Sequence, residues 1–339
     1  MVAQEQKAVL AKLFNHTEKQ TQVQVGGVLW GRLTTCAPIG NRRKLAGNAP
    51  KWGGRPRPRA TPWSRRDAGS MGIMNELLRT LPSGAAVLDI GSGRGSFDMT
   101  GGSFTVVRTD LERQAPQSGP NFVQADAANL PFPDRRFDLI ISNHSLEHFG
   151  DLAGSLREIG RVVRPNGALF VAVPDATTIS DRLYRWLARG GGHVNPFASA
   201  ADLASTIARA TGLRHVATRT LCTSLACLNR LNRVAPPPRR LLLLGGGTET
   251  SLLMITYLLR LADRFLGTRA SVYGWALYFG NVGATVDCTT WTNVCVRCGA
   301  GHPSAWLLQE HMVKRGLQIL PTYRCPGCRT RNFFTDDKG

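Results

Sequence analysis

The sequence is short of acidic residues and of long apolar runs. Its 339 residues include 42 lysines and arginines against 23 aspartates and glutamates, which gives a formal charge of +19. No apolar run reaches the 18 or more residues that a membrane-spanning helix needs. The first residues also lack the apolar core and the small-residue cleavage pattern of a secretory signal. We therefore expect a cytoplasmic protein without a transmembrane segment, and peripheral contact with a membrane surface stays open.

Half of the excess positive charge lies in residues 1–67, which carry 13 basic and 3 acidic side chains. From Gly40 to Arg66 there is no acid, and glycine, proline and arginine are frequent. Such a composition buries too little apolar surface to order itself. We interpret residues 1–67 as a basic, disordered N-terminal extension. It is either a plain solvated extension or an arm that binds the phosphates of nucleic acid or of anionic lipid.

What the sequence does contain is organised around residues 87–95, VLDIGSGRG. A short strand leads into glycines 91, 93 and 95, which let the backbone turn sharply and approach a ligand, and a helix is expected next. These parts form the nucleotide-binding corner of a doubly wound α/β fold. Ser96 stands where a dinucleotide fingerprint has its third glycine. The nearby Asp89 suits a cationic, amino-acid-bearing ligand better than a pyrophosphate.

Polar residues follow the next strands at the same edge of the predicted sheet. Asp110 ends a strand over 104–110, 19 residues after Gly91, close to the offset at which a carboxylate accepts from a ribose. Asp126 follows a short strand and is placed to accept from an exocyclic amine. Residues 137–142 are typical of a buried parallel strand. The polar segment 143–148 follows it, where open α/β sheets bind ligands.

These segments resemble a known family. VLDIGSGRG, the acid in RTDL, QADAANLPFPDRRFDLI, SNHSLEHF and REIGRVVRPNGALFVAVPD are similar to the motifs of class I S-adenosylmethionine-dependent methyltransferases. The resemblance is strongest to the type 11 group, which acts mainly on small molecules, lipids, quinones and sugars, and it covers roughly residues 70–220. It implies a Rossmann-like, doubly wound, seven-stranded and mostly parallel α/β sheet, with S-adenosylmethionine as the cofactor.

The resemblance also implies which residues contact the cofactor. Asp89 and the loop from Gly91 to Gly95 would hold the methionine part, Asp110 the ribose, and Asp126 with Ala127 the adenine. The complete set of expected cofactor residues is Asp89, Gly91, Ser92, Gly93, Gly95, Asp110, Leu111, Asp126, Ala127 and Asn143.

We expect the methyltransferase domain over residues 68–283, with a first helix at 71–81. Further strands are expected at 168–173, 214–221 and 272–279. The last two normally form a tight antiparallel pair, yet an apolar insertion, 222–271, separates them. Its helix at roughly 251–266 is interpreted as a cap over a hydrophobic substrate, as an interfacial helix, or as ordinary packing against the domain or a dimer partner.

Four of the eight cysteines have metal-ligand spacing. Cys295 and Cys298 form one CxxC knuckle, and Cys325 and Cys328 form a second. Two such knuckles complete the tetrahedral thiolate shell of a structural zinc ion, so residues 284–339 are predicted to form a zinc-ribbon-like module. Disulfides are the alternative. His302 and His311 are possible substitute ligands, although four cysteines are sufficient. The other four cysteines have no partner spacing and are expected to be plain or buried thiols: Cys36, Cys222, Cys227 and Cys288.

Methyl transfer needs alignment of the nucleophile with the methyl group, and sometimes removal of a proton. His144, His148 and His193 are the candidate bases, because two of them follow the fourth strand and the third lies in the segment expected to cover the substrate. Each is equally compatible with a structural role.

Three functions follow from these features. The first is methyl transfer to a small-molecule, sugar or lipid-linked acceptor, with oxygen as the expected acceptor atom. The second is methylation of RNA or another nucleic acid, with the basic arm and the ribbon as the binding surface. Against it, no Asp/Asn-Pro-Pro-Tyr/Phe segment follows the fourth strand, and no cysteine lies near Pro174. The third is a non-catalytic scaffold, which has no need of the acids at 89, 110 and 126.

Overall fold

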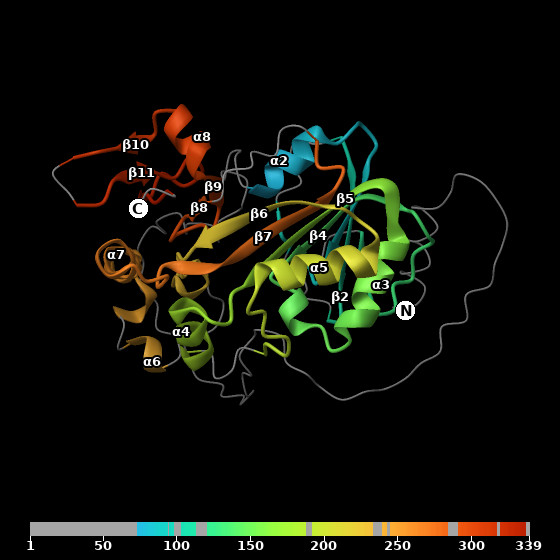
Figure 1. The fold of residues 1–339 in the computed structure, drawn as a ribbon, viewed down its shortest axis with the longest axis horizontal. Coiled ribbons are helices and arrows are strands. Elements are labelled where there is room, and N and C mark those ends of the chain that lie inside the picture. Colours follow the sequence, from blue (N-terminus) through green and yellow to red (C-terminus); the bar gives the residue numbers. More distant parts are fainter. Residues whose placement is uncertain are drawn as a thin grey trace, which may run out of the picture.

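A nine-stranded, mostly parallel sheet runs through the molecule and positions its other elements (Figure 1). The structure is a computed structural model of the chain. The described residues are 73–93, 95–97, 103–112, 121–187, 192–232, 239–242, 245–283, 291–316 and 319–336. The predicted N-terminal extension, Cys36 and Cys288 lie outside them.

The parallel half of the sheet is built from short apolar strands. They are β1 (Ala86–Ile90), β2 (Thr105–Asp110), β3 (Phe122–Gln124), β4 (Phe137–Asn143) and β5 (Val163–Pro174). Their order in the sheet is β3-β2-β1-β4-β5. The chain thus places β2 and β3 on one side of β1, and then returns to place β4 and β5 on the other side. In open α/β sheets such a switch point leaves a crevice at the carboxyl ends of the strands, where ligands bind.

In the other half of the sheet, the strand next to β5 runs antiparallel to its neighbours. Strand β7 (Val272–Gly280) lies between β5 and β6 (His215–Cys222) and runs antiparallel to both. The predicted pairing of the sixth and seventh strands is therefore confirmed, although the insertion separates them in sequence. These seven strands are the ones predicted from the sequence, in the order expected of a Rossmann-like methyltransferase fold.

Helices cover both faces of the sheet. Helices α3 (Leu152–Val162) and α5 (Ala200–Thr211) pack together across the front of the sheet in Figure 1. Their buried side chains, such as Ile159 and Ile207, share one apolar core with the strands. Helix α2 (Ile73–Thr80) contributes Leu77 and Leu78 to a second core. The helix expected directly after the glycine loop falls on 98–102, outside the described residues.

The insertion forms a third, smaller core beside the sheet. It comprises the 3₁₀ turns η3 (Ala226–Leu228) and η4 (Gly245–Gly247) and the helices α6 (Arg239–Leu242) and α7 (Glu249–Leu266). Helix α4 (Ile179–Leu187) packs against this group through Leu187, which meets Leu241 and Leu252. Among the described residues, no helix combines the length and the apolar character needed to cross a membrane.

The cysteine-bearing segment extends the main sheet by two strands. Strand β8 (Trp291–Val294) pairs in parallel with β6, and β9 (Gly301–Pro303) pairs antiparallel with β8. Helix α8 (Ser304–Gln309) follows, and a second sheet contains β10 (Val313–Lys314), β11 (Thr322–Arg324) and β12 (Arg331–Phe333). Because β8 covers the edge of β6, the sheet has nine strands instead of the predicted seven. The domain boundary at 283/284 stays a prediction.

Candidate functional site

The glycine loop after β1 is held by two buried carboxylates. Asp89 is fully buried and accepts hydrogen bonds from Ser96 N (2.9 Å) and Ser96 Oγ (2.6 Å). Asp110, at the end of β2, accepts from Gly93 N at 2.8 Å. Gly91 has φ +61°, and a Cβ there would collide with the Ser145 side chain. Glycine is therefore required at this position both for its backbone conformation and for the close approach of the loop to β4.

The other expected cofactor residues line the same edge of the sheet. Asp126 follows β3, where its exposed carboxylate accepts from Ala128 N at 3.0 Å. Leu111, directly after β2, is 56% exposed. Ala127 is buried, and Asn143 ends β4 half-buried. One acid thus ends β2 and another follows β3, both at the edge where the glycine loop lies. An exposed apolar side chain adjoins them. Carboxylate acceptors beside an apolar surface fit an adenosine with a ribose diol and an amine-bearing chain.

Asp89 is already partnered inside the protein. Besides Ser96, the guanidinium of Arg108 lies 3.7 Å from its carboxylate. Asp89 therefore fixes the shape of the loop in this structure. Its expected contact with the methionine part of the cofactor stays a prediction.

Three histidines and two acids converge next to this edge. His144 follows β4, while Glu147 and His148 lie in the 3₁₀ turn η2 (Leu146–His148). His193 comes from the segment before α5, and its ring packs against that of His148 with centroids 4.9 Å apart. Asp181, on α4, is the second acid, and its Oδ1 lies 3.4 Å from His193 Nδ1. All three candidate bases from the sequence thus belong to one cluster.

Burial dominates the electrostatics of the cluster. It lowers the pKa of His144 to about 4, helped by His193 and His148. It also raises the pKa of Glu147 to about 8. The pKa of His148 is lowered, again mainly by burial and against the opposing effect of its bond to the Gly192 carbonyl. Near neutral pH, His144 is therefore uncharged and Glu147 is close to its own titration.

Sequence reasoning missed Asp181 and Arg185, which hold the cluster from α4. Arg185 Nε lies 2.7 Å from Asp181 Oδ2, one helical turn away. A pocket of about 200 Å³ opens at this place. It is lined by Pro174, Ala176, Asp181, Arg185, His193, Val194, Asn195, Pro196 and Phe197. The only signal in the sequence was the i, i+4 pairing of the two charges on a predicted helix.

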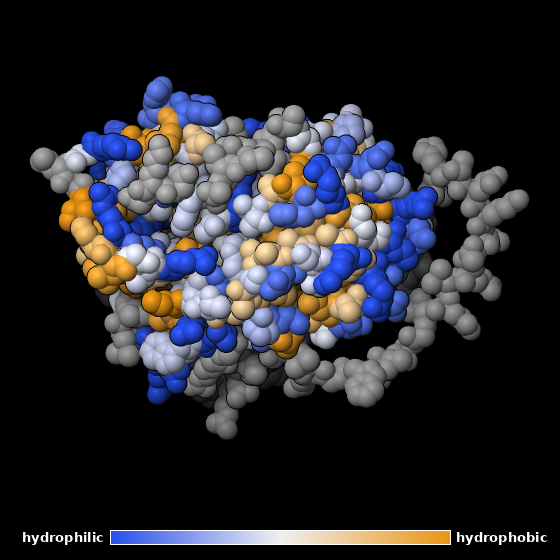
Figure 2. Space-filling model, in the orientation of Figure 1, coloured by the Kyte–Doolittle hydropathy of each residue, from blue (hydrophilic) through white to orange (hydrophobic). Residues whose placement is uncertain are grey.

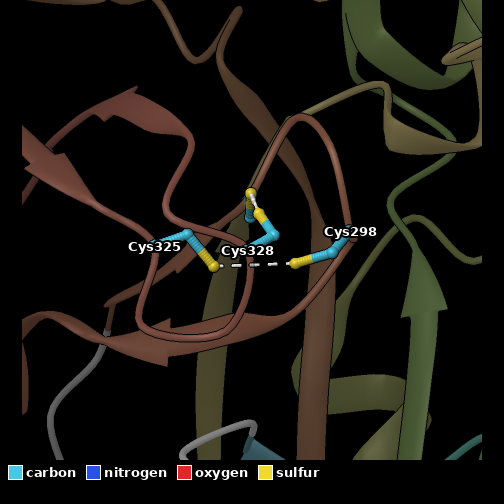
Figure 3. Close-up of side chains that lie close together, drawn as sticks. Cys298, Cys325 and Cys328 are labelled. Carbon is cyan, nitrogen blue, oxygen red and sulfur yellow. Dashed lines mark hydrogen bonds between the residues drawn. The ribbon is translucent and has the colours of Figure 1, made fainter. Parts of the chain in front are cut away.

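The four predicted zinc ligands come together in the C-terminal segment, as Figure 3 shows for Cys298, Cys325 and Cys328. Cys295 Sγ lies 3.5 Å from Cys328 Sγ, and Cys298 Sγ lies 3.6 Å from Cys325 Sγ. Four thiolates around a tetrahedral zinc ion are about 3.8 Å apart, so the sulfur positions fit the ion. All four are free thiols in the structure, whereas disulfides were the alternative. That these cysteines bind a zinc ion stays a prediction.

Two further residues contact the sulfurs: Asn332, which the sequence did not indicate, and His302, which it offered as a possible substitute ligand. Asn332 Nδ2 lies 3.4 Å from Cys295 Sγ. His302 Nε2 lies 3.4 Å from Cys325 Sγ, beside the ligand set instead of within it. His311 is exposed and stands apart. Buried Cys222 has a pKa raised to about 11 by burial, in keeping with a plain buried thiol.

Comparison with known proteins places this geometry in context. Residues 63–218 match the family model of a methyltransferase domain. A malonyl-[acyl-carrier protein] O-methyltransferase of Pseudescherichia vulneris is 33% identical over 132 residues, covering 36% of this chain and 53% of the relative. The arginine-hydroxylase NDUFAF5 of Rattus norvegicus is 30% identical over 187 residues, covering 50% of this chain and 54% of the relative. The chain thus spans about half the length of these curated relatives.

Among solved structures, the YcgJ protein of Bacillus subtilis superposes with a TM-score of 0.41 at 21% sequence identity. The match covers 65% of this chain and 100% of that one.

Proposed function

We propose that this chain, whose residues 63–218 match the family model of a methyltransferase domain, transfers a methyl group from S-adenosylmethionine to a small-molecule or lipid-linked acceptor. The observation that carries the proposal is the glycine loop between two buried acids, Asp89 and Asp110, with Asp126 at the next strand end. Bound S-adenosylmethionine supplies an activated methyl group. The residues of this chain have to hold it and to align the acceptor.

Each cofactor contact is proposed at a residue that the sequence singled out. Asp110 would turn from Gly93 N toward the ribose hydroxyls, and Asp126 would face the adenine. Asn143 and the loop glycines would border the methionine part. The contact between Asp110 and the loop is a single hydrogen bond of 2.8 Å, so exchanging it for a bond to the cofactor costs little.

The acceptor is proposed to bind on the side of the histidine cluster. An oxygen acceptor has to lose a proton during transfer, and this end of the sheet holds His144, His148 and His193 in one half-buried cluster. The relative that acts on malonyl-[acyl-carrier protein] is named an O-methyltransferase, which agrees with oxygen as the acceptor atom.

The outer face of α7 supports a hydrophobic or membrane-presented acceptor. Met254, Leu258 and Phe265 are 52%, 58% and 66% exposed and follow one another at helical spacing. Arg264 and Arg269 are exposed beside them. Figure 2 shows apolar surface gathered at this edge of the molecule. An exposed apolar stripe bordered by arginines is typical of a helix that rests on an anionic lipid surface.

A labelling experiment tests the proposal. The full chain is incubated with methyl-labelled S-adenosylmethionine and a cell extract, and the label is followed into lipid, small-molecule, RNA and protein fractions. Label in lipid or small molecules, lost in the Asp110→Ala variant, is the expected result. Label in RNA would instead establish the nucleic-acid alternative, and no incorporation in any fraction would contradict methyl transfer altogether.

A further inference from the structure

We propose that Glu147, His148 and His193 form a binding site for a divalent transition-metal cation, separate from the four cysteines. One ligand atom from each residue lies within 4.8 Å of the other two. Two imidazoles and one carboxylate are the ligand set of many catalytic zinc sites and of non-haem iron sites. Nothing in the sequence motifs shared with methyltransferases requires His193 to meet Glu147.

The backbone holds the two halves of the site together. The carbonyl oxygen of Glu147 accepts from both Val194 N (2.8 Å) and Asn195 N (3.0 Å). The Asn195 side chain then donates to the carbonyl oxygens of Leu146 (3.0 Å) and Phe149 (2.7 Å). Four hydrogen bonds therefore attach the segment that carries His193 to the turn that carries Glu147 and His148. The three ligands are positioned before any ion arrives.

Both histidines are oriented as metal ligands are. His148 Nδ1 lies 2.9 Å from the Gly192 carbonyl oxygen, so it carries the proton and donates it there. His193 Nδ1 faces Asp181 Oδ1 at 3.4 Å, and Asp181 is itself held by Arg185. This leaves His148 Nε2 with its lone pair, and the nearby Asp181 carboxylate favours the same tautomer of His193. A carboxylate or carbonyl behind each imidazole is the usual outer partner of a metal-bound histidine.

The third ligand is a buried acid with one unpaired oxygen. Glu147 is 1% exposed, and its Oε2 has no hydrogen bond within the described part of the chain. His144 Nδ1 stands 3.9 Å from the other oxygen. A buried polar oxygen without a hydrogen bond is costly, whereas a cation at Oε2 would satisfy it. Asp181 is a second buried acid in the cluster. Arg185 balances the negative charge of Asp181 and makes no ion pair with Glu147 in the described part of the chain.

The ligand set selects the kind of ion. Bound to one zinc-like ion, the three atoms would stand about 3 Å apart, so small rotations of the side chains complete the site. Three protein ligands leave at least one position open, and His193 also borders the pocket beside α4. If the proposed methyl transfer to oxygen holds, an acceptor hydroxyl bound at the open position would lose its proton more readily. The metal site itself does not depend on that role.

Metal counting with Co²⁺, a spectroscopic stand-in for Zn²⁺, tests the proposal on the full chain. The protein is loaded with Co²⁺ and desalted, and the metal per chain and the visible absorption are measured. We expect the wild type to hold one ion more than a Glu147→Gln/His193→Gln variant. The sulfur-to-cobalt absorption of the cysteine site should be the same in both, which also shows that the variant is folded. A His311→Gln variant, which removes an exposed histidine elsewhere, should keep the extra ion.

Equal metal content in the wild type and the double variant would overturn the site. If the double variant fails to fold, His148→Gln alone is used, and it too should lose one ion. Binding of S-adenosylmethionine, measured by calorimetry on the same samples, should be unchanged by the variants. Failure of the metal proposal is therefore distinguishable from failure of the proposed methyltransferase function.

Discussion

At the scale of single residues, Arg161 shows how one side chain fixes the loop that leads into β4. Its guanidinium donates to the carbonyl oxygens of Leu130 (3.0 Å) and Phe132 (2.7 Å). It also pairs with Asp134 at 2.8 Å and with Glu158 through two bonds of 2.7 Å. An arginine is needed here because its planar fork serves several acceptors at once.

This cluster predicts a pH dependence of stability. The hydrogen bonds from Arg161 lower the pKa of Glu158 from its ordinary 4.5. A carboxylate whose pKa is lower in the folded state stabilises the fold above pH 4.5, and that contribution disappears as the pH falls through the folded-state pKa. Glu158→Gln should therefore lower the melting temperature at pH 7 and converge with the wild type in acid. Thermal unfolding over a pH series measures this.

The exposed Glu310→Gln provides the control, with the same charge change outside the cluster. A Glu158→Gln deficit that stayed constant down to pH 3 would show that packing, and not charge, is responsible.

Prediction from the sequence was uneven at this scale. The acids at 89, 110 and 126 and the loop glycines could be placed at one edge of the sheet, because their spacing follows from strand length and turn geometry. Asp181 and Arg185 could not, because their role depends on α4 packing beside a histidine from a different segment. The joining of His193 to Glu147 depends on main-chain hydrogen bonds, which leave no trace in the residue types.

At the scale of elements, the turn after β1 determines how closely the loop approaches β4. Gly91 and Gly84 both have positive φ, but a Cβ at Gly91 would meet Ser145, whereas at Gly84 nothing lies within 4 Å. Both alanine substitutions carry backbone strain, and only the first adds a collision in a packed region.

Gly91→Ala should therefore destabilise the fold by about 1–3 kcal/mol more than Gly84→Ala, and it should also weaken cofactor binding. Urea unfolding of the two variants measures the difference. Equal losses would mean that the loop shifts away from Ser145 without penalty.

The seven strands of the methyltransferase fold were predictable, since each is a short apolar run ended by turn residues. Strands β8 and β9 were not. The four residues of β8 lie beside a CxxC knuckle and carry little strand signal. The partner of β8 is β6, some seventy residues away in sequence. An exposed sheet edge is satisfied by any nearby extended segment, so the pairing depends on the tertiary arrangement.

At the scale of the whole molecule, the cysteine segment is joined to the central sheet through β8. Removing a metal ion from the four cysteines should therefore affect more than the C-terminal segment. We expect chelation under reducing conditions to lower the melting temperature of the full chain, and added Zn²⁺ to restore it. Differential scanning calorimetry with and without chelator measures the change. An unchanged transition would contradict a structural metal.

Calorimetric titration of the full chain tests most directly whether the loop held by Asp89 and Asp110 binds S-adenosylmethionine. The wild type should bind the cofactor, and Asp110→Ala should weaken binding at least tenfold, about 1.4 kcal/mol, while the variant stays folded, as its urea unfolding curve shows. Unchanged affinity in Asp110→Ala, or no binding by the wild type, would contradict the account.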